Sequence, residues 1–90
     1  MSRGLSCVIP AYNEAPRIAA VLASVVDHPA IDEVIVVDDG SSDGTAEAAA
    51  AVPGIRLIRL EQNRGKSWAV SVGIEAAAQE LVLLLDSDLL

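Results

Sequence analysis

Aromatic residues are nearly absent from this sequence, which has no phenylalanine, one tryptophan and one tyrosine among its 90 residues. A hydrophobic core must therefore be built from aliphatic side chains, and 52% of the residues are hydrophobic. Branched residues favour strands and alanines favour closely packed helices, so this mixture is typical of an α/β protein. A chain of this length makes one small domain at most.

Cysteine and long apolar runs are scarce as well. The single cysteine, Cys7, permits no internal disulfide, and we expect it to be an inert buried thiol in a strand. No apolar run approaches the roughly 18 residues that a membrane-spanning helix needs, and the N-terminus lacks the profile of a signal peptide. These absences predict a soluble, cytoplasmic protein with no membrane segment in this chain.

Basic residues are outnumbered, because 6 lysines and arginines face 13 acids and give a net charge of −7. This excess argues against nucleic acid or an anionic membrane as the main partner. It still allows a phosphate ligand, provided that a divalent cation and a few local bases neutralise it.

Strand-like apolar runs alternate with helical segments along the chain. The expected strands are Leu5–Pro10, Glu33–Asp38, Ile55–Leu60 and Leu81–Asp86. Three helices are expected. The first follows Asn13, the second follows the turn at 40–45 and runs to Val52, and the third spans Gly65–Gln79. This alternation implies right-handed crossovers between parallel strands. The predicted fold class is α/β, a Rossmann-like parallel sheet with helices on both faces.

Several polar or large residues have simple structural interpretations. Asn13 is a suitable cap for the first helix, and Asp43 is predicted to be the N-cap of the second. Trp68 shares a helical face with Val72 and is predicted to belong to the core. His28, near the end of the first helix, is expected to face solvent.

Polar residues gather after each predicted strand, at the edge where parallel α/β sheets bind ligands. In chain order they are Tyr12, Asn13, Glu14, Asp38, Asp39, Asp43, Asn63, Arg64, Lys66, Asp86 and Asp88. Six carboxylates on one rim would repel one another, so this arrangement predicts a ligand that is cationic or donates hydrogen bonds.

The acids at the end of the chain suit a metal ion bound together with phosphate. Asp86 and Asp88 offer the one or two carboxylates that Mg²⁺ or Mn²⁺ takes besides phosphate oxygens. Lys66, at the start of a helix, places a charge where a diphosphate would bind. A helix cap and a solvated loop acid explain Asp86 and Asp88 equally well when the pair is taken alone.

Two other phosphate-binding patterns compete as weaker alternatives. Gly65-Lys66-Ser67 opens a helix as a P-loop does, but Leu60 stands where that motif requires its first glycine. A receiver or haloacid-dehalogenase-like phosphoryl-transfer domain also carries acids after strands. The defining acids of those families follow the first strand, whereas the acids here follow the second and fourth.

Four motifs follow one another along the chain, VIPAYNE at 8–14, VVDDGSSDGT at 36–45, NRGK at 63–66 and LLDSDL at 84–89. In sequence and order they resemble the motifs of family 2 glycosyltransferases of the GT-A fold. The resemblance spans nearly the whole chain and is particularly to the branch that includes polyprenol-phosphate sugar transferases. It implies that residues 1–90 are the N-terminal nucleotide-sugar-binding part of a GT-A domain, truncated after the DxD motif.

The resemblance also implies a role for individual residues. The residues that would bind a nucleotide-diphosphate sugar of UDP or GDP type are Pro10, Ala11, Tyr12, Glu14, Asp39, Lys66 and Asp86. Asp88 would bind the Mg²⁺ or Mn²⁺ that bridges the diphosphate. The family's catalytic base belongs to an acceptor-binding region beyond the DxD motif, so we assign no catalytic residue and expect this chain alone to be inactive.

The expected function is therefore metal-dependent transfer of a sugar from a nucleotide-diphosphate sugar to an acceptor, with this chain supplying the donor-binding half. The alternative from another class is a non-catalytic nucleotide-binding module. Apolar edges of the sheet would favour self-association, so we also expect a homodimer.

Overall fold

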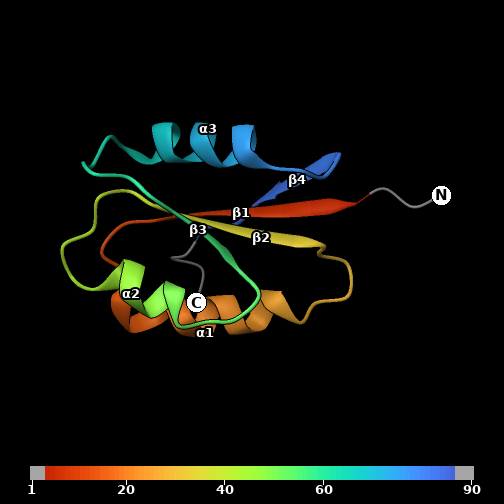
Figure 1. Ribbon diagram of the computed structural model, residues 1–90, viewed down its shortest axis with the longest axis horizontal. Coiled ribbons are helices and arrows are strands. Elements are labelled where there is room, and N and C mark those ends of the chain that lie inside the picture. The colour runs from red at the N-terminus through yellow and green to blue at the C-terminus, as the bar shows by residue number, and fades with distance from the viewer. Residues whose placement is uncertain (1–3, 87–90) are drawn as a thin grey trace.

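The computed structural model describes residues 4–86, which form four strands and three helices. The strands are β1 (Leu5–Ala11), β2 (Glu33–Asp38), β3 (Arg56–Arg59) and β4 (Leu81–Leu84). The helices are α1 (Ala15–Val26), α2 (Thr45–Ala50) and α3 (Lys66–Ala76). All four strands are parallel in the order β3-β2-β1-β4, with α1 and α2 on one face and α3 on the other (Figure 1). The predicted α/β fold is confirmed.

The inner strand β2 supplies side chains to both faces of the sheet. Val34 and Val36 belong to the core that also contains the buried face of α1, whereas Ile35 and Val37 pack with Ala69 of α3. Successive side chains of a strand point to opposite faces, so a continuous apolar run is what a sheet covered on both sides requires. Each buried branched side chain contributes about 1.5 to 3 kcal/mol.

Helix α1 buries the face that the sequence predicts. Ile18, Val21, Leu22 and Val25 are buried at helical spacing, and Pro16 stands in the first turn, where a missing N–H costs nothing. Cys7 is also buried, as expected, and burial raises the pKa of its thiol.

Helices α2 and α3 are shorter than predicted, because α2 ends at Ala50 and α3 ends at Ala76. The prediction that Trp68 belongs to the core is wrong. Its side chain is 50% exposed, and the guanidinium of Arg64 lies 5.6 Å from the centre of its ring. Position 68 lies to the side of the α3 face that meets the sheet, where Ala69 and Gly73 are buried.

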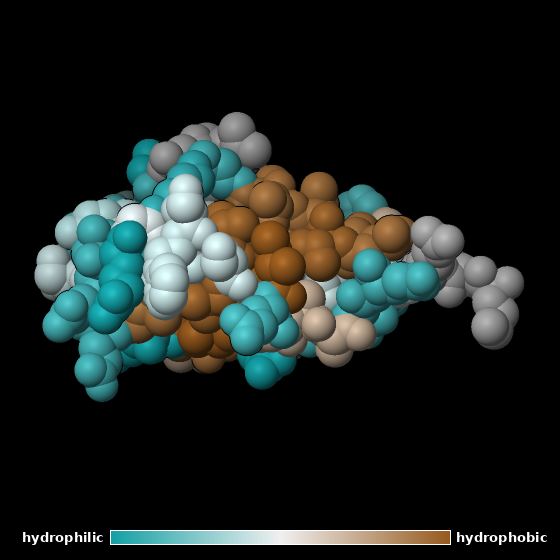
Figure 2. All heavy atoms as spheres, turned by 90° about the horizontal axis from the view of Figure 1, so that it is seen from above, coloured by the Kyte–Doolittle hydropathy of each residue, from teal (hydrophilic) through white to brown (hydrophobic). Residues whose placement is uncertain are grey.

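Strand β4 is an exposed apolar edge. It pairs with β1, and its four residues Leu81–Leu84 are 38% to 50% exposed. Figure 2 shows apolar side chains gathered on this side of the molecule, between polar regions. No helix within residues 4–86 combines the length and the apolar character that crossing a membrane requires.

Candidate functional site

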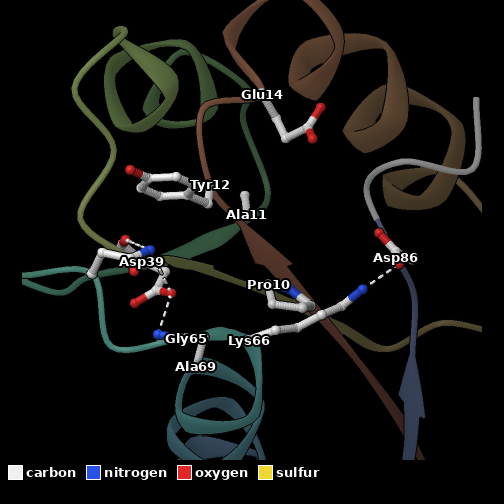
Figure 3. A pocket seen from close by; sticks show the side chains of 10 residues that line it. Pro10, Ala11, Tyr12, Glu14, Asp39, Gly65, Lys66, Ala69 and Asp86 are labelled. Atoms are coloured by element: carbon white, nitrogen blue, oxygen red, sulfur yellow. Dashed lines mark hydrogen bonds and ion pairs between the residues drawn. The ribbon is translucent and has the colours of Figure 1, made fainter.

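A cavity of about 270 Å³ opens at the carboxyl ends of the strands. Its lining comprises Pro10, Ala11, Tyr12, Glu14, Asp39, Asn63, Gly65, Lys66, Ala69 and Asp86 (Figure 3). All seven residues predicted to bind the nucleotide sugar are among these ten. The predicted metal ligand, Asp88, lies outside the described residues.

The other three lining residues were given no role in binding the nucleotide sugar, although Asn63 was placed on the polar rim. Asn63 and Gly65 belong to the NRGK motif that was recognised, so their signal was present in the sequence. Ala69 lies one turn into α3, and its N–H donates to the carbonyl of Gly65, the residue before the helix, at 3.1 Å. A small residue at that position leaves room for the cavity.

The strand order places the cavity. The chain moves outward from β1 through β2 to β3 and then crosses back to β4 on the other side of β1, and ligands bind in the crevice at such a switch point. The N–H of Leu85 donates to the carbonyl of Val8 at 3.0 Å, where the ladder between β1 and β4 ends. Two residues on, Pro10 faces the same side but has no N–H with which to continue that ladder. The two strands separate there, and the cavity opens.

The adjacent acids Asp38 and Asp39 point to opposite faces of the sheet. Asp38 is fully buried on the face of α1 and α2, and its nearest cation is the Nε of Arg59 at 4.0 Å. Neither of its carboxylate oxygens has a hydrogen-bond partner within residues 4–86. Asp39 instead faces the cavity and the start of α3. Asp38 is therefore absent from the acidic rim that the sequence predicts.

Asp39 organises the loop that leads into α3. Its carboxylate accepts hydrogen bonds from the N–H of Arg64 at 2.8 Å, the N–H of Gly65 at 2.9 Å and the side-chain amide of Asn63 at 3.1 Å. A carboxylate has about four acceptor positions, so roughly one remains for a ligand. The residue predicted to recognise the nucleotide thus also fixes the backbone beside it.

Lys66 and Asp86 form an ion pair across the cavity (Figure 3). Lys66 is the first residue of α3, and Asp86 follows the end of β4. Both side chains are partly exposed, so the pair contributes little to stability. The pair sets a cation and a carboxylate beside the positive end of α3. The cation and the helix end together are suitable for an anionic ligand.

The donor set fits a hard divalent cation that is bound together with phosphate. Within residues 4–86, no group of three or more His, Cys, Asp or Glu side chains could hold a metal. Asp86 nevertheless offers a carboxylate at the cavity, and Asp88 stands two positions further on. Mg²⁺ needs only one or two protein carboxylates when phosphate oxygens and water complete its shell.

Tyr12 and Glu14 line the side of the cavity opposite α3 (Figure 3). The ring of Tyr12 is 48% exposed and is available to a ligand. Glu14 is only 7% exposed, and its carboxylate accepts a hydrogen bond from the Nε of Arg17 at 2.8 Å. A planar aromatic group and a neutralised acid therefore face the same space.

The predicted helix caps are wrong. The N-cap residue of α1 is Glu14 and that of α2 is Gly44, and neither makes a side-chain cap hydrogen bond. Asp43 bridges the two helices instead, because its carboxylate accepts from the N–H of Ala15 at 3.2 Å and from the N–H of Thr45 at 3.1 Å. The hydroxyl of Thr45 also donates to Asp43 and is the main cause that lowers the pKa of this carboxyl.

Comparisons with known proteins agree on a family. The model of glycosyl transferase family 2 matches residues 6–90. The undecaprenyl-phosphate 4-deoxy-4-formamido-L-arabinose transferase of Aeromonas hydrophila is 43% identical over 96 residues, which cover 94% of this chain and 29% of that protein. The chain thus spans less than a third of the length of this relative.

Solved structures give the same result. A mannosyltransferase from Pyrobaculum calidifontis, in complex with GDP-Man and Mn²⁺, has a TM-score of 0.86 at 31% identity, covering 98% of this chain and 28% of that one. Glucosyl-3-phosphoglycerate synthase from Mycobacterium tuberculosis, in complex with Mn²⁺, UDP and glucosyl-3-phosphoglycerate, has a TM-score of 0.82 at 35% identity, with 99% and 35% covered. The fold is that of GT-A glycosyltransferases.

The family match decides among the alternatives that the motifs left open. The P-loop and phosphoryl-transfer interpretations are wrong, and the Gly-Lys pair and the acids after the strands belong to another kind of site. The match covers 85 of the 90 residues (6–90). The chain belongs to glycosyl transferase family 2.

Proposed function

We propose that this chain is the donor-binding part of a metal-dependent glycosyltransferase and that its cavity binds a nucleotide-diphosphate sugar of UDP or GDP type. The observation that carries the proposal is the convergence of seven predicted ligand residues, from distant parts of the sequence, on one cavity. The structural relatives solved with GDP-Man or UDP and Mn²⁺ support this ligand class.

The nucleoside would lie against the end of β1. Pro10, Ala11 and Tyr12 offer an apolar and aromatic surface there, and Asp39 retains roughly one acceptor position for a base N–H. Glu14 is close enough to the same space to contact base or ribose. These roles are supported by the position of the side chains in the cavity.

The diphosphate would lie between the start of α3 and the end of β4. Lys66 contributes a positive charge beside the N-terminus of the helix, Asp86 would face the ribose, and Asp88 would hold Mg²⁺ or Mn²⁺ with the phosphates. The metal ion, when bound, stabilises the charge of the departing nucleoside diphosphate. An acceptor hydroxyl or phosphate oxygen would attack the anomeric carbon of the sugar while the bond to the diphosphate breaks, so that the nucleoside diphosphate leaves with that electron pair. The proton of a hydroxyl acceptor would pass to the catalytic base of the acceptor-binding region.

We also propose that residues 1–90 form the N-terminal part of a GT-A domain that includes the DxD motif. The share of the relatives that the chain spans supports this assignment, as does the apolar exposure of β4. No residue of the chain is proposed as the catalytic base. The cytoplasmic location and the homodimer stay predictions.

Calorimetric titration of the chain with UDP, GDP and ATP, each with and without Mn²⁺, tests the proposed function. We expect UDP or GDP to bind and Mn²⁺ to strengthen that binding, because the metal neutralises the diphosphate beside an acidic rim. Binding that gains nothing from Mn²⁺ would favour the non-catalytic nucleotide-binding module. A preference for ATP would contradict the proposal.

A pair of variants tests the metal assignment. Asp88→Asn should abolish the gain from Mn²⁺, since an amide is a much weaker metal ligand than a carboxylate. Asp27→Asn removes the same charge at the far end of α1 and should leave nucleotide binding unchanged. Equal affinities for Asp88→Asn and the parent protein in Mn²⁺ would show that Asp88 does not hold the metal.

A further inference from the structure

We propose that Asn13 and Ser41 are positioning residues, which hold Tyr12 and Glu14 in place for the nucleotide although neither lines the cavity. The inference rests on the proposed function. It assigns a role to the GSSDGT segment at 40–45, none of whose side chains is among the cavity-lining residues.

The segment after β1 is bound, almost residue by residue, to the segment after β2. The hydrogen bonds run from Asp39 N–H to Ala11 O (2.9 Å), Asn13 N–H to Ser41 Oγ (2.8 Å), Ser42 N–H to Asn13 Oδ1 (3.0 Å), Glu14 N–H to Thr45 Oγ1 (2.8 Å) and Ala15 N–H to Asp43 Oδ2 (3.2 Å). Each bond joins residues about 30 positions apart, so the segment after β2 fixes the conformation of the segment after β1.

Asn13 lies at the centre of these hydrogen bonds and makes two of them. Its φ of +52° lies in the left-handed region, which Asn tolerates better than most residues because its short side chain bonds locally. Both its backbone N–H and its side-chain oxygen are held by the 41–42 turn. The chain reverses direction at this point, so that Tyr12 on one side and Glu14 on the other both face the cavity.

Glu14 and Tyr12 differ in how firmly they are held, and this difference explains why a small change at Asn13 should affect the cavity. Thr45 is fully buried, and its hydroxyl fixes the N–H of Glu14. Tyr12, by contrast, is held through its neighbours Ala11 and Asn13, whose hydrogen bonds are the nearest on either side of its exposed ring. Loss of the bond at Asn13 therefore frees Tyr12 first.

Two adjacent serines offer a matched experiment. The hydroxyl of Ser41 accepts the N–H of Asn13, whereas Ser42 contributes its backbone N–H, which survives substitution. Ser41→Ala should weaken the binding of UDP or GDP in Mn²⁺ by about 3- to 10-fold, the worth of one net hydrogen bond. Ser42→Ala should bind within about twofold of the parent protein, and Ser41→Thr should restore binding because it keeps the hydroxyl.

A second variant acts on the same contact from the other side. Asn13→Gly permits the positive φ and removes the oxygen that accepts from Ser42, so it should weaken nucleotide binding as Ser41→Ala does. The ring of Tyr12 is the only tyrosine ring in the sequence, so its NMR signals can be followed without ligand. Both variants should broaden or shift these signals while Ser42→Ala leaves them in place.

The outcomes separate this inference from the proposed function. If the parent protein binds neither UDP nor GDP, the proposed function fails and the inference fails with it. If the parent binds and Ser41→Ala and Asn13→Gly bind equally well, only the inference is wrong. A lower unfolding temperature with unchanged affinity and unchanged Tyr12 signals would show that the contacts are structural alone and would also overturn it.

Discussion

At the scale of single residues, the two acids at the end of β2 show how one position decides a role. Asp38 and Asp39 are chemically identical neighbours, yet the alternation of a strand sends one into the α1 and α2 face and the other to the cavity. Asp39 then satisfies three donors of the loop before α3. A substitution at Asp39 should therefore disturb the loop backbone as well as the nucleotide.

The glycines of the same turn give a prediction about stability. Gly40 and Gly44 both have positive φ, of +72° and +89°. A Cβ at Gly40 would stand 2.4 Å from the backbone nitrogen of Asn63, whereas a Cβ at Gly44 would meet nothing within 4 Å. Gly44→Ala should cost about 1 kcal/mol of backbone strain, and Gly40→Ala about 2 to 4 kcal/mol because overpacking adds to that strain.

Urea unfolding of the two variants checks this difference. Gly44→Ala separates backbone strain from overpacking, since both alanines carry the strain and only the one at position 40 meets a neighbour. Equal losses in the free energy of unfolding would show that the 40–41 turn does not press against residues 62–63. Gly40→Ala should also weaken nucleotide binding, because Asn63 and its neighbours are the donors that Asp39 holds.

The sequence predicted the cavity-lining residues better than it predicted the caps, and the reason is distance along the chain. The end of a strand can be located from an apolar run, so the residues after it can be assigned to one edge of the sheet. The partner of Asn13 lies about 30 residues away in the sequence, and Asp43 bonds to Ala15 at a similar separation as well as to Thr45, two residues on. Local capping rules assume a partner within the same turn, so they failed at Asn13, where a tertiary contact replaced it, and missed the tertiary contact of Asp43.

At the scale of elements, α3 lies so close to the sheet at Gly73 that a larger residue there would meet the strands. A Cβ at Gly73 would stand 2.3 Å from Cγ1 of Val8 and 3.2 Å from Cγ2 of Val37. The glycine thus lets the helix approach β1 and β2, which brings Lys66 and Ala69 to the cavity at the other end of the helix. The helix would gain propensity from an alanine there, but the clash is larger than that gain.

We therefore predict that Gly73→Ala lowers the free energy of unfolding by about 1 to 3 kcal/mol, as overpacking does. Ser71→Ala, on the exposed side of the same helix, should be neutral or slightly stabilising. Thermal unfolding of both variants provides the measurement. Val8→Ala in the Gly73→Ala background should recover part of the loss, and an additive loss in the double variant would contradict a direct contact.

Element boundaries were predicted less well than element identity. The strand and helix order was correct throughout, because the apolar runs and breaks are clear. Helix α3 ends three residues before the predicted Gln79, where Ala77 takes an extended conformation and the chain turns toward β4. Alanines continue past that point, so propensity alone gave no stop signal.

At the scale of the whole molecule, carboxylates join neighbouring elements at both ends of the sheet. At the amino end, Glu33 accepts from the hydroxyl of Ser6 at 2.6 Å and from the N–H of Ala78 at 2.9 Å, so it joins β1, β2 and the segment before β4. At the carboxyl end, Asp43 joins the starts of α1 and α2. These contacts lower the pKa of Glu33, chiefly through Ser6, and that of Asp43, chiefly through Thr45.

A lowered pKa in the folded state fixes the sign of the pH dependence. Each group binds protons more weakly when folded, so its contribution is complete above the unfolded pKa of about 4.3 for Glu and 3.9 for Asp, and it is lost as the pH falls below that value. The free energy of unfolding should be level from about pH 6 to 5 and decline below about pH 4.5.

Urea titrations across this pH range measure the free energy of unfolding. Glu33→Gln keeps an oxygen that can accept from Ser6 and Ala78 but does not titrate, so its decline should be shallower than that of the parent protein. Equal slopes for the two proteins would show that Glu33 does not couple protonation to the integrity of the sheet.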